Sequence, residues 1–252
     1  MTTKPGDWNA SVYDRVADPQ TRWGAGVLER LPLDGDETVL DAGCGTGRVT
    51  ELLLGRLPRG HVVALDASGS MLAEARTRLK RFGDQVEFVR ADLAEPLPLH
   101  EPVDAILSTA TFHWVRDHDA LFANLAAVLR PGGWLVAQCG GAGNVETMLR
   151  VARSIAPDFS REHRFETAEA TRERLEATGF TDIQTWLSEE PTRFEPGEPF
   201  EAFLETVCLR TYLDHLPEDR RKPFVAAVAE RMGEPVLDYV RLNIVARRSG
   251  GA

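Results

Sequence analysis

Residues 38–47 read Thr38-Val-Leu-Asp-Ala-Gly-Cys-Gly-Thr-Gly47, a short apolar run that enters a turn with three glycines at alternate positions. A helical pattern, Arg48-Val-Thr-Glu-Leu, follows at once. Glycine permits a positive φ and lets a ligand lie against bare main chain. The first N–H groups of the next helix have no intrahelical partner and point to the same place. The stretch therefore predicts a nucleotide-type pocket at the carboxyl edge of a parallel sheet.

The positions of the acidic residues distinguish between kinds of nucleotide pocket. A dinucleotide fingerprint reads G-x-G-x-x-G, with an acid about 20 residues later. Here Asp41 precedes the glycines, a second apolar run ends at Asp66, and a third leads to Asp92. A glycine-rich turn alone is a weak signal, and Asp often caps the helix after a strand. All three landmarks in this order are much harder to obtain by chance.

This order of landmarks resembles the class I S-adenosylmethionine-dependent methyltransferases. The resemblance implies that Asp41 and the turn face the amino acid part of the cofactor, that Asp66 binds the two ribose hydroxyls, and that Asp92 contacts the adenine amino group. The expected cofactor is S-adenosyl-L-methionine, with NAD as the weaker alternative. The cofactor-binding residues that the resemblance implies are Asp41, Gly43, Cys44, Gly45, Gly47, Asp66, Ala67, Met71, Ala91, Asp92, Leu93 and Ser108.

Strand and helix patterns alternate along the chain, which predicts an α/β fold with a parallel sheet. Strands are expected at 38–42, 61–66, 85–90, 103–108, 134–139, 181–187 and 236–246. Helices are expected at 47–57, at 70–82, after Asp117 or Asp119, and at 167–178. The resembled family has a Rossmann-like, mostly parallel sheet of seven strands in the order 3-2-1-4-5-7-6.

The same patterns divide the chain into a core and a cap. Residues 31–189 form the expected cofactor-binding core, and residues 236–252 supply its last strand. Residues 190–235 are longer than a hairpin needs and contain two amphipathic stretches, 200–213 and 218–232, which indicate a helical cap. Residues 1–30 are the expected N-terminal part of that cap.

The bulk composition excludes several classes of protein. The formal charge of −10 argues against a nucleic-acid groove, which needs clustered Lys and Arg. No apolar run approaches the roughly 20 residues of a membrane span, and residues 1–7 contain no apolar signal core. The 3 cysteines and 6 histidines show no metal-ligand spacing. We expect a cytoplasmic monomer or homodimer that acts on a small molecule, without a metal, nucleic-acid or membrane partner.

The segment Ser108-Thr-Ala-Thr-Phe-His113-Trp114, after the fourth strand, should form the floor of the acceptor pocket. His113 can donate, accept or take a proton near neutral pH. Trp114 offers a large apolar wall with one N–H donor. The alternative is structural: His113 hydrogen-bonds to the backbone and Trp114 belongs to the core.

A closer resemblance covers nearly the whole chain. Asp7-Trp8-Asn9-x-x-x-Tyr13, Trp114-Val-Arg-Asp-His-Asp-Ala-Leu-Phe122 and Val240-Arg-Leu-Asn-Ile-Val-Ala-Arg-Arg248 are similar to the family of trans-aconitate 2-methyltransferases. The resemblance implies O-methylation of a carboxylate on a small acid. His113 is the candidate catalytic residue, and the candidate substrate-binding residues are Trp8, Tyr13, Trp114, Arg210 and Arg241.

Two departures leave the acceptor open. The segment 232–240 is shorter than in that family, and His113 stands where an amide is expected. C- or O-methylation of a natural-product or quinone-like acceptor is therefore an alternative, and a non-catalytic cofactor-binding protein is an alternative of another class. Arg210 and Arg241 could instead pair with neighbours such as Glu205 or Asp238 at the surface, where ion pairs contribute little.

Overall fold

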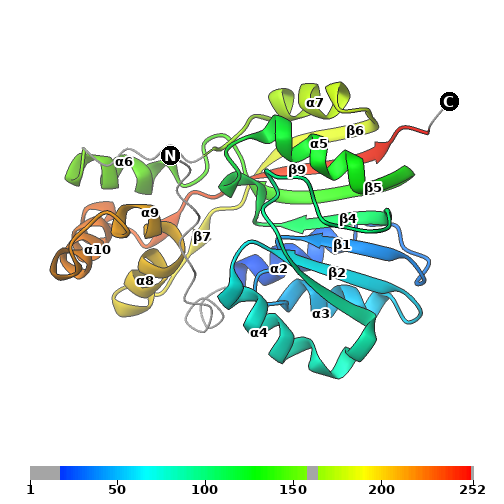
Figure 1. Ribbon diagram of the computed structural model, residues 1–252. Coiled ribbons are helices and arrows are strands. Elements are labelled where there is room, and N and C mark those ends of the chain that lie inside the picture. Colours follow the sequence, from blue (N-terminus) through cyan, green and yellow to red (C-terminus); the bar gives the residue numbers. More distant parts are fainter. Residues whose placement is uncertain (1–17, 158–163, 251–252) are drawn as a thin grey trace.

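The computed structural model describes residues 18–157 and 164–250, with side chains from residue 22 onward. Trp8 and Tyr13 lie outside the described residues. A seven-stranded sheet has the order β3-β2-β1-β4-β5-β9-β6 (Figure 1). The strands are β1 (Thr38–Ala42), β2 (His61–Asp66), β3 (Val86–Arg90), β4 (Val103–Thr109), β5 (Leu129–Gly140), β6 (Phe180–Glu189) and β9 (Val240–Arg248).

This order confirms the predicted sheet. β9 is the predicted seventh strand, and it pairs antiparallel with both β5 and β6. The strand expected over 236–246 is two strands, because β8 (Val236–Leu237) leaves the main sheet to pair with β7 (Thr192–Arg193).

Some of the helices cover the two faces of the sheet, and the others pack against one another beside it (Figure 1). The helices are α2 (Asp18–Leu28), α3 (Arg48–Arg56), α4 (Gly69–Leu79), α5 (His118–Val128), α6 (Glu146–Ile155), α7 (Ala168–Ala177), α8 (Glu198–Phe203), α9 (Arg210–Leu213) and α10 (Glu218–Met232). Three of them start where a side-chain oxygen accepts a backbone N–H: Ser68, Asp117 and Thr167. These are the residue types that stabilise helix N-termini. The helix expected over 70–82 ends at Leu79 and continues as the 3₁₀ turn η1 (Lys80–Gln85).

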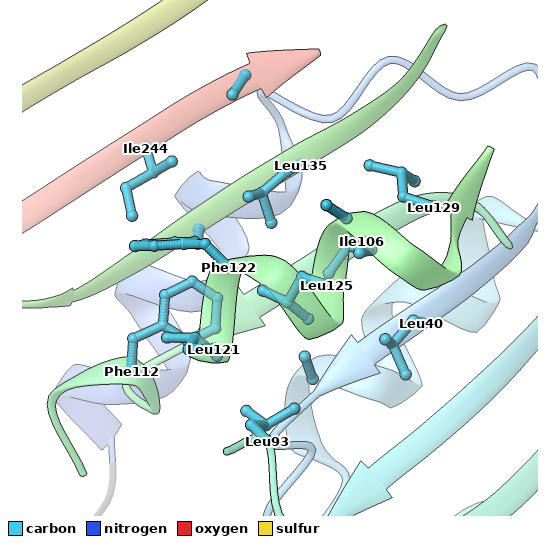
Figure 2. Packing of buried hydrophobic residues seen from close by; sticks show 14 of the residues in the cluster. Leu40, Leu93, Ile106, Phe112, Leu121, Phe122, Leu125, Leu129, Leu135 and Ile244 are labelled. Carbon is cyan, nitrogen blue, oxygen red and sulfur yellow. The ribbon is translucent and has the colours of Figure 1, made fainter. Parts of the chain in front are cut away.

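Two apolar clusters sandwich the sheet, as a parallel sheet buried on both faces requires. On one face α5 sets Phe122 and Leu125 against Leu135 and Ile106 (Figure 2). On the other face α2, α3 and α4 contribute to a cluster that includes Val27. This packing leaves the carboxyl ends of the strands as the edge where loops can build a site.

A third cluster forms the cap, where α6 packs against α10 and the α8–α9 region (Figure 1). Helix α6 was not predicted: it follows Val145, which has a left-handed conformation (φ 49°) and no capping side chain. The stretch 200–213 is interrupted by a π turn, η3 (Leu204–Cys208), between α8 and α9. The boundaries proposed for core and cap, at 31–189 and 190–235, stay a prediction.

No helix within the described ranges is long and apolar enough to cross a membrane.

Candidate cofactor and acceptor site

The glycine turn is tied to the end of the neighbouring strand. The backbone N–H groups of Gly43 and Cys44 both donate to the carbonyl of Leu65, at 2.8 and 2.9 Å. The N–H of Gly45 donates to Oδ2 of Asp66 at 2.9 Å. Two of the predicted landmarks therefore meet at one edge of the sheet.

Glycine is required in this turn for two different reasons. Gly43 has φ +88°, and a Cβ on it would lie 2.1 Å from Oγ1 of Thr111. Gly45 has φ +55°, and a Cβ there would meet nothing within 4 Å. The turn therefore presents bare main chain to open space, which is the cradle that a ligand needs.

Asp41 supplies a buried acceptor directly beneath the turn. Its side chain is 1 % exposed, and its Oδ2 accepts a 2.6 Å hydrogen bond from Thr50 Oγ1. Its Oδ1 has no hydrogen-bond partner among the described residues. Burial raises the pKa of Asp41 to about 7; the Thr50 hydrogen bond opposes the rise and the charge of Asp66 adds to it. A buried carboxyl group with an unused acceptor oxygen can bind a donor such as an ammonium group.

The pKa of Asp41 predicts a pH-dependent stability. Because the folded-state pKa of about 7 lies above the ordinary value of 3.8, the folded protein holds this proton more tightly than the unfolded chain. The resulting stability is complete below about pH 4 and is lost as the pH rises through about 7. From about pH 5 to about pH 8, the free energy of unfolding of the cofactor-free protein should fall by on the order of 2 kcal/mol through this group.

Urea unfolding at several pH values measures this dependence. Asp41→Asn should flatten it, whereas Asp104→Asn, at the opposite edge of the sheet, should leave it unchanged. An equally steep fall in the Asp41→Asn variant would contradict the assignment.

The remaining predicted cofactor residues lie along the same edge. Asp66 also accepts the N–H of Ser68 through Oδ1, at 2.8 Å. A carboxylate accepts up to about four hydrogen bonds, so holding the turn is compatible with binding ribose hydroxyls. Asp92 is exposed and accepts the N–H of Ala94 at 3.0 Å.

Several of these residues also stabilise the fold. Ser108 is buried and donates to the carbonyl of Ala42 at 2.6 Å, which ties β4 to β1. Met71 and Leu93 are buried, and Leu93 belongs to the cluster beneath α5. Burial raises the pKa of the Cys44 thiol well above its usual value, so this cysteine packs the turn as a neutral group.

His113 lies in the short 3₁₀ turn η2 (Phe112–Trp114) that follows β4. Ala110 turns the chain there with a left-handed backbone, φ 56°, and its N–H donates to the carbonyl of Gln138 at 2.7 Å. The N–H of Gly140 donates to Nδ1 of His113 at 3.2 Å. Because Nδ1 accepts this bond, the proton of the neutral ring is placed on Nε2.

Aromatic rings stand beside His113. The ring centroids of Trp114 and Phe165 lie 5.1 and 5.8 Å from that of the imidazole. A Cβ on Gly140 would come within 2.7 Å of Phe165 Cε1, so glycine at this position makes room for the ring. The sequence did not indicate a role for Phe165, because residues 164–166 belong to no periodic helix or strand. A bridge from Glu166 to Gly141 holds the segment in place.

Arg241 is buried, which corrects the alternative of a surface ion pair with Asp238. Its side chain is 3 % exposed, and the guanidinium carbon lies 4.7 Å from the ring centroid of Trp23 and 5.9 Å from that of Tyr239. Asp238 instead accepts the N–H and the hydroxyl of Thr147. Arg241 pairs in register with Gly140, the residue that donates to His113, so the backbone at Arg241 lies next to the backbone that supports His113.

Arg210 is on the cap helix α9. Its Nε lies 3.9 Å from Oδ2 of Asp214, one helical turn away. The side chain is 20 % exposed, so this pair is partly open to solvent.

Comparisons with known proteins show which proteins this chain is similar to. A family model described as a methyltransferase domain matches residues 39–133. The trans-aconitate 2-methyltransferases of Methylobacterium nodulans and Paracidovorax citrulli are each 34% identical, over 96% of this chain and 99% of their own length. The phosphoethanolamine N-methyltransferase 2 of Haemonchus contortus, solved with phosphomonomethylethanolamine and S-adenosylhomocysteine, superposes with a TM-score of 0.64 at 19% identity. That match covers 96% of this chain and 57% of the other, and it shows a shared fold.

The sheet order, the glycine turn with its three acids and the matched domain define a class I S-adenosylmethionine-dependent methyltransferase. Its cofactor is S-adenosyl-L-methionine, and the bare turn and the buried acceptor of Asp41 fit that molecule. The identity and coverage of the relatives are specific as well: the chain belongs to the trans-aconitate 2-methyltransferase family.

Proposed function

We propose that this enzyme O-methylates a carboxylate of a small organic acid. The observation that carries the proposal is Arg241, a guanidinium 3 % exposed at the carboxyl edge of the sheet in a chain of net charge −10. Its planar fork matches both oxygens of a carboxylate. The family membership supports the same acceptor class, since the relatives are named for trans-aconitate.

The side chains around Arg241 would align and shield the acceptor. S-adenosylmethionine, when bound, supplies the activated methyl group. The acceptor oxygen must lie on the axis of the bond that breaks, and alignment of this kind lowers a barrier by several kcal/mol. Trp23 beside Arg241, and Trp114 and Phe165 beside His113, offer aromatic surfaces against which the acceptor could lie. Trp8, Tyr13 and Arg210 stay further candidates for contacts with the acceptor.

Under this proposal, His113 is a hydrogen-bond donor to the acceptor. A carboxylate is ionised at neutral pH and needs no base before it attacks. The Gly140 N–H directs the proton of the neutral imidazole to Nε2, the form that donates to an acceptor oxygen. His113 therefore supplies an N–H donor, as the amide expected at this position would.

A product analysis tests the proposal. The protein is incubated with S-adenosylmethionine and trans-aconitate, or with a neutral phenol, and the products are analysed by mass spectrometry. We expect trans-aconitate to gain one methylene, and mild alkali to remove it because the product is an ester. A methyl group that resists alkali, or appears only on the phenol, would favour the ether- or carbon-forming alternatives. Cofactor binding without transfer to any acceptor would favour a binding protein.

The role of His113 predicts a particular kinetic change. His113→Ala should raise the KM for the acid about 10-fold while kcat changes by less than about 3-fold. The reason is that the hydrogen bond to the acid is lost equally in the ground state and in the transition state. His113→Asn should recover most of the affinity, since it keeps an N–H donor. His61→Ala, at the far edge of β2, is the control. A drop in kcat of about 100-fold at unchanged KM would instead identify a general base.

A further inference from the structure

The side-chain amide of Asn243 is the centre of a buried polar network. Its side chain is 0 % exposed. Oδ1 accepts hydrogen bonds from Arg30 Nη1 at 2.6 Å and from Gln138 Nε2 at 2.8 Å. Nδ2 donates to Ser188 Oγ at 3.0 Å and to the carbonyl of Arg241 at 3.2 Å. Two donors and two acceptor positions are the whole capacity of an amide, so every one is used.

The network joins the parts that carry the acceptor-site candidates. Arg241 and Asn243 are two residues apart on β9 and therefore face the same side of the sheet. Helix α2 packs on the neighbouring strands β4 and β5, and it places Trp23 against Arg241. Arg30, in the turn that ends α2, reaches Asn243. Helix α2 is thus fastened to β9 at two points.

The same network reaches the His113 segment through Gln138. The carbonyl of Gln138 accepts the N–H of Ala110, at the turn that leads to His113. The side-chain amide of Gln138 donates to Asn243. One buried side chain is therefore linked to the Arg241 backbone, to the helix with Trp23 and to the strand that supports His113.

We propose that Asn243 is a positioning residue of the acceptor site, which holds Trp23, Arg241 and the His113 segment in one arrangement. Its kinetic consequence rests on the proposed function. A fully satisfied buried network is rigid, and the low local dielectric makes each missing partner costly. Loosening it should misplace the groups proposed to bind the acceptor. The glycine turn, which follows β1 and is held by Leu65 and Asp66, should keep its affinity for the cofactor.

The chain offers a matched pair of variants for the test. Arg30 stacks over the ring of Trp186 at 5.2 Å and donates one hydrogen bond to Asn243. Arg247, at the far end of β9, stacks over Trp134 at 5.3 Å and donates to the carbonyl of Gly132 at 2.8 Å. Arg30→Met and Arg247→Met lose the same kinds of contact, but only the first touches Asn243. Arg30→Lys keeps a charged donor and serves as the rescue.

Kinetics with trans-aconitate and calorimetry with S-adenosylmethionine give the first readout. We expect Arg30→Met to raise the acceptor KM about 10-fold, or ~1.4 kcal/mol, and Asn243→Leu to raise it further. The cofactor Kd should stay within about 2-fold of the parent, and Arg30→Lys should restore most of the acceptor KM. The proposal would be overturned if Arg30→Met lowered the thermal stability but had the same kinetic constants as Arg247→Met.

Hydrogen exchange gives a readout that needs no acceptor. Arg30→Met should speed the exchange of the α2 amides, whereas Arg247→Met should not. If the parent itself fails to methylate trans-aconitate, that acid is not its acceptor, and exchange alone decides about Asn243. Equal α2 exchange in the two methionine variants would then overturn the positioning role.

Discussion

Replacing Asp66 with alanine should weaken S-adenosylmethionine binding by about 100-fold, measured by calorimetry. Two hydroxyls would lose a charged acceptor, and hydrogen bonds to charged groups contribute about 1.5–3 kcal/mol each. The structure adds a second reason, because Asp66 also holds the N–H of Gly45 in the glycine turn. Asp66→Asn, which keeps an acceptor oxygen without the charge, should fall between the parent and the alanine variant.

Asp104 provides the control for this experiment. Its Oδ2 accepts the N–H of Thr38 at 2.8 Å, so it also fastens β1, but at the opposite edge of the sheet. Asp104→Ala should therefore lower stability and leave the cofactor Kd within about 3-fold. Unchanged affinity in Asp66→Ala would remove Asp66 from the site, and a clear calorimetric signal with NAD would overturn the choice of nucleotide.

Replacing Arg241 with methionine should reduce kcat/KM for an acidic acceptor by at least about 100-fold. Removing one partner of a buried charge pair costs about 2–5 kcal/mol, and each 1.36 kcal/mol is tenfold in rate. Arg210→Met should cost about 10-fold or less, because Arg210 is partly solvated beside Asp214. The cofactor Kd should be unchanged in both variants.

The stability of Arg241→Met must be measured alongside its activity, since Arg241 also packs on Trp23. Arg241→Lys keeps the charge but not the planar fork, and should be intermediate in activity. If a folded Arg241→Met variant methylates its acceptor as fast as the parent, Arg241 does not bind substrate. A neutral phenol or an activated carbon would then be the better candidate acceptor.

The cofactor half of the molecule was predictable because its signals are local. The glycine turn, Asp66 and the alternation of strands and helices each occupy a few consecutive residues, and the sheet order followed from them by resemblance. The cap was harder to predict. Helix α6 begins at a left-handed Val145 without a capping side chain, and the π turn at Leu204–Cys208 breaks a stretch whose amphipathic pattern looks continuous.

The acceptor side depends on contacts between distant parts of the chain, which no local pattern encodes. Arginine is rarely buried unless it is paired, so the sequence could not reveal that Trp23 would cover Arg241. The same holds for Phe165, whose place beside His113 depends on the absence of a side chain at Gly140. The glycine and the ring that it admits come from different segments.

The contacts between α2 and β9 affect the order in which parts of the fold form during translation. Arg30 and Asn243 are separated by 213 residues, and β9 stands between β5 and β6 in the sheet. A nascent chain can assemble the parallel strands and the glycine turn as they leave the ribosome, since chains fold by N-terminal units first. β9 emerges after the other six strands of the sheet, and until then Arg241 is absent and the edge of β5 is unpaired. The growing polypeptide therefore forms the glycine turn well before β9 joins the sheet, and on the proposed function it gains competence for transfer only after that strand, with Arg241, is in place.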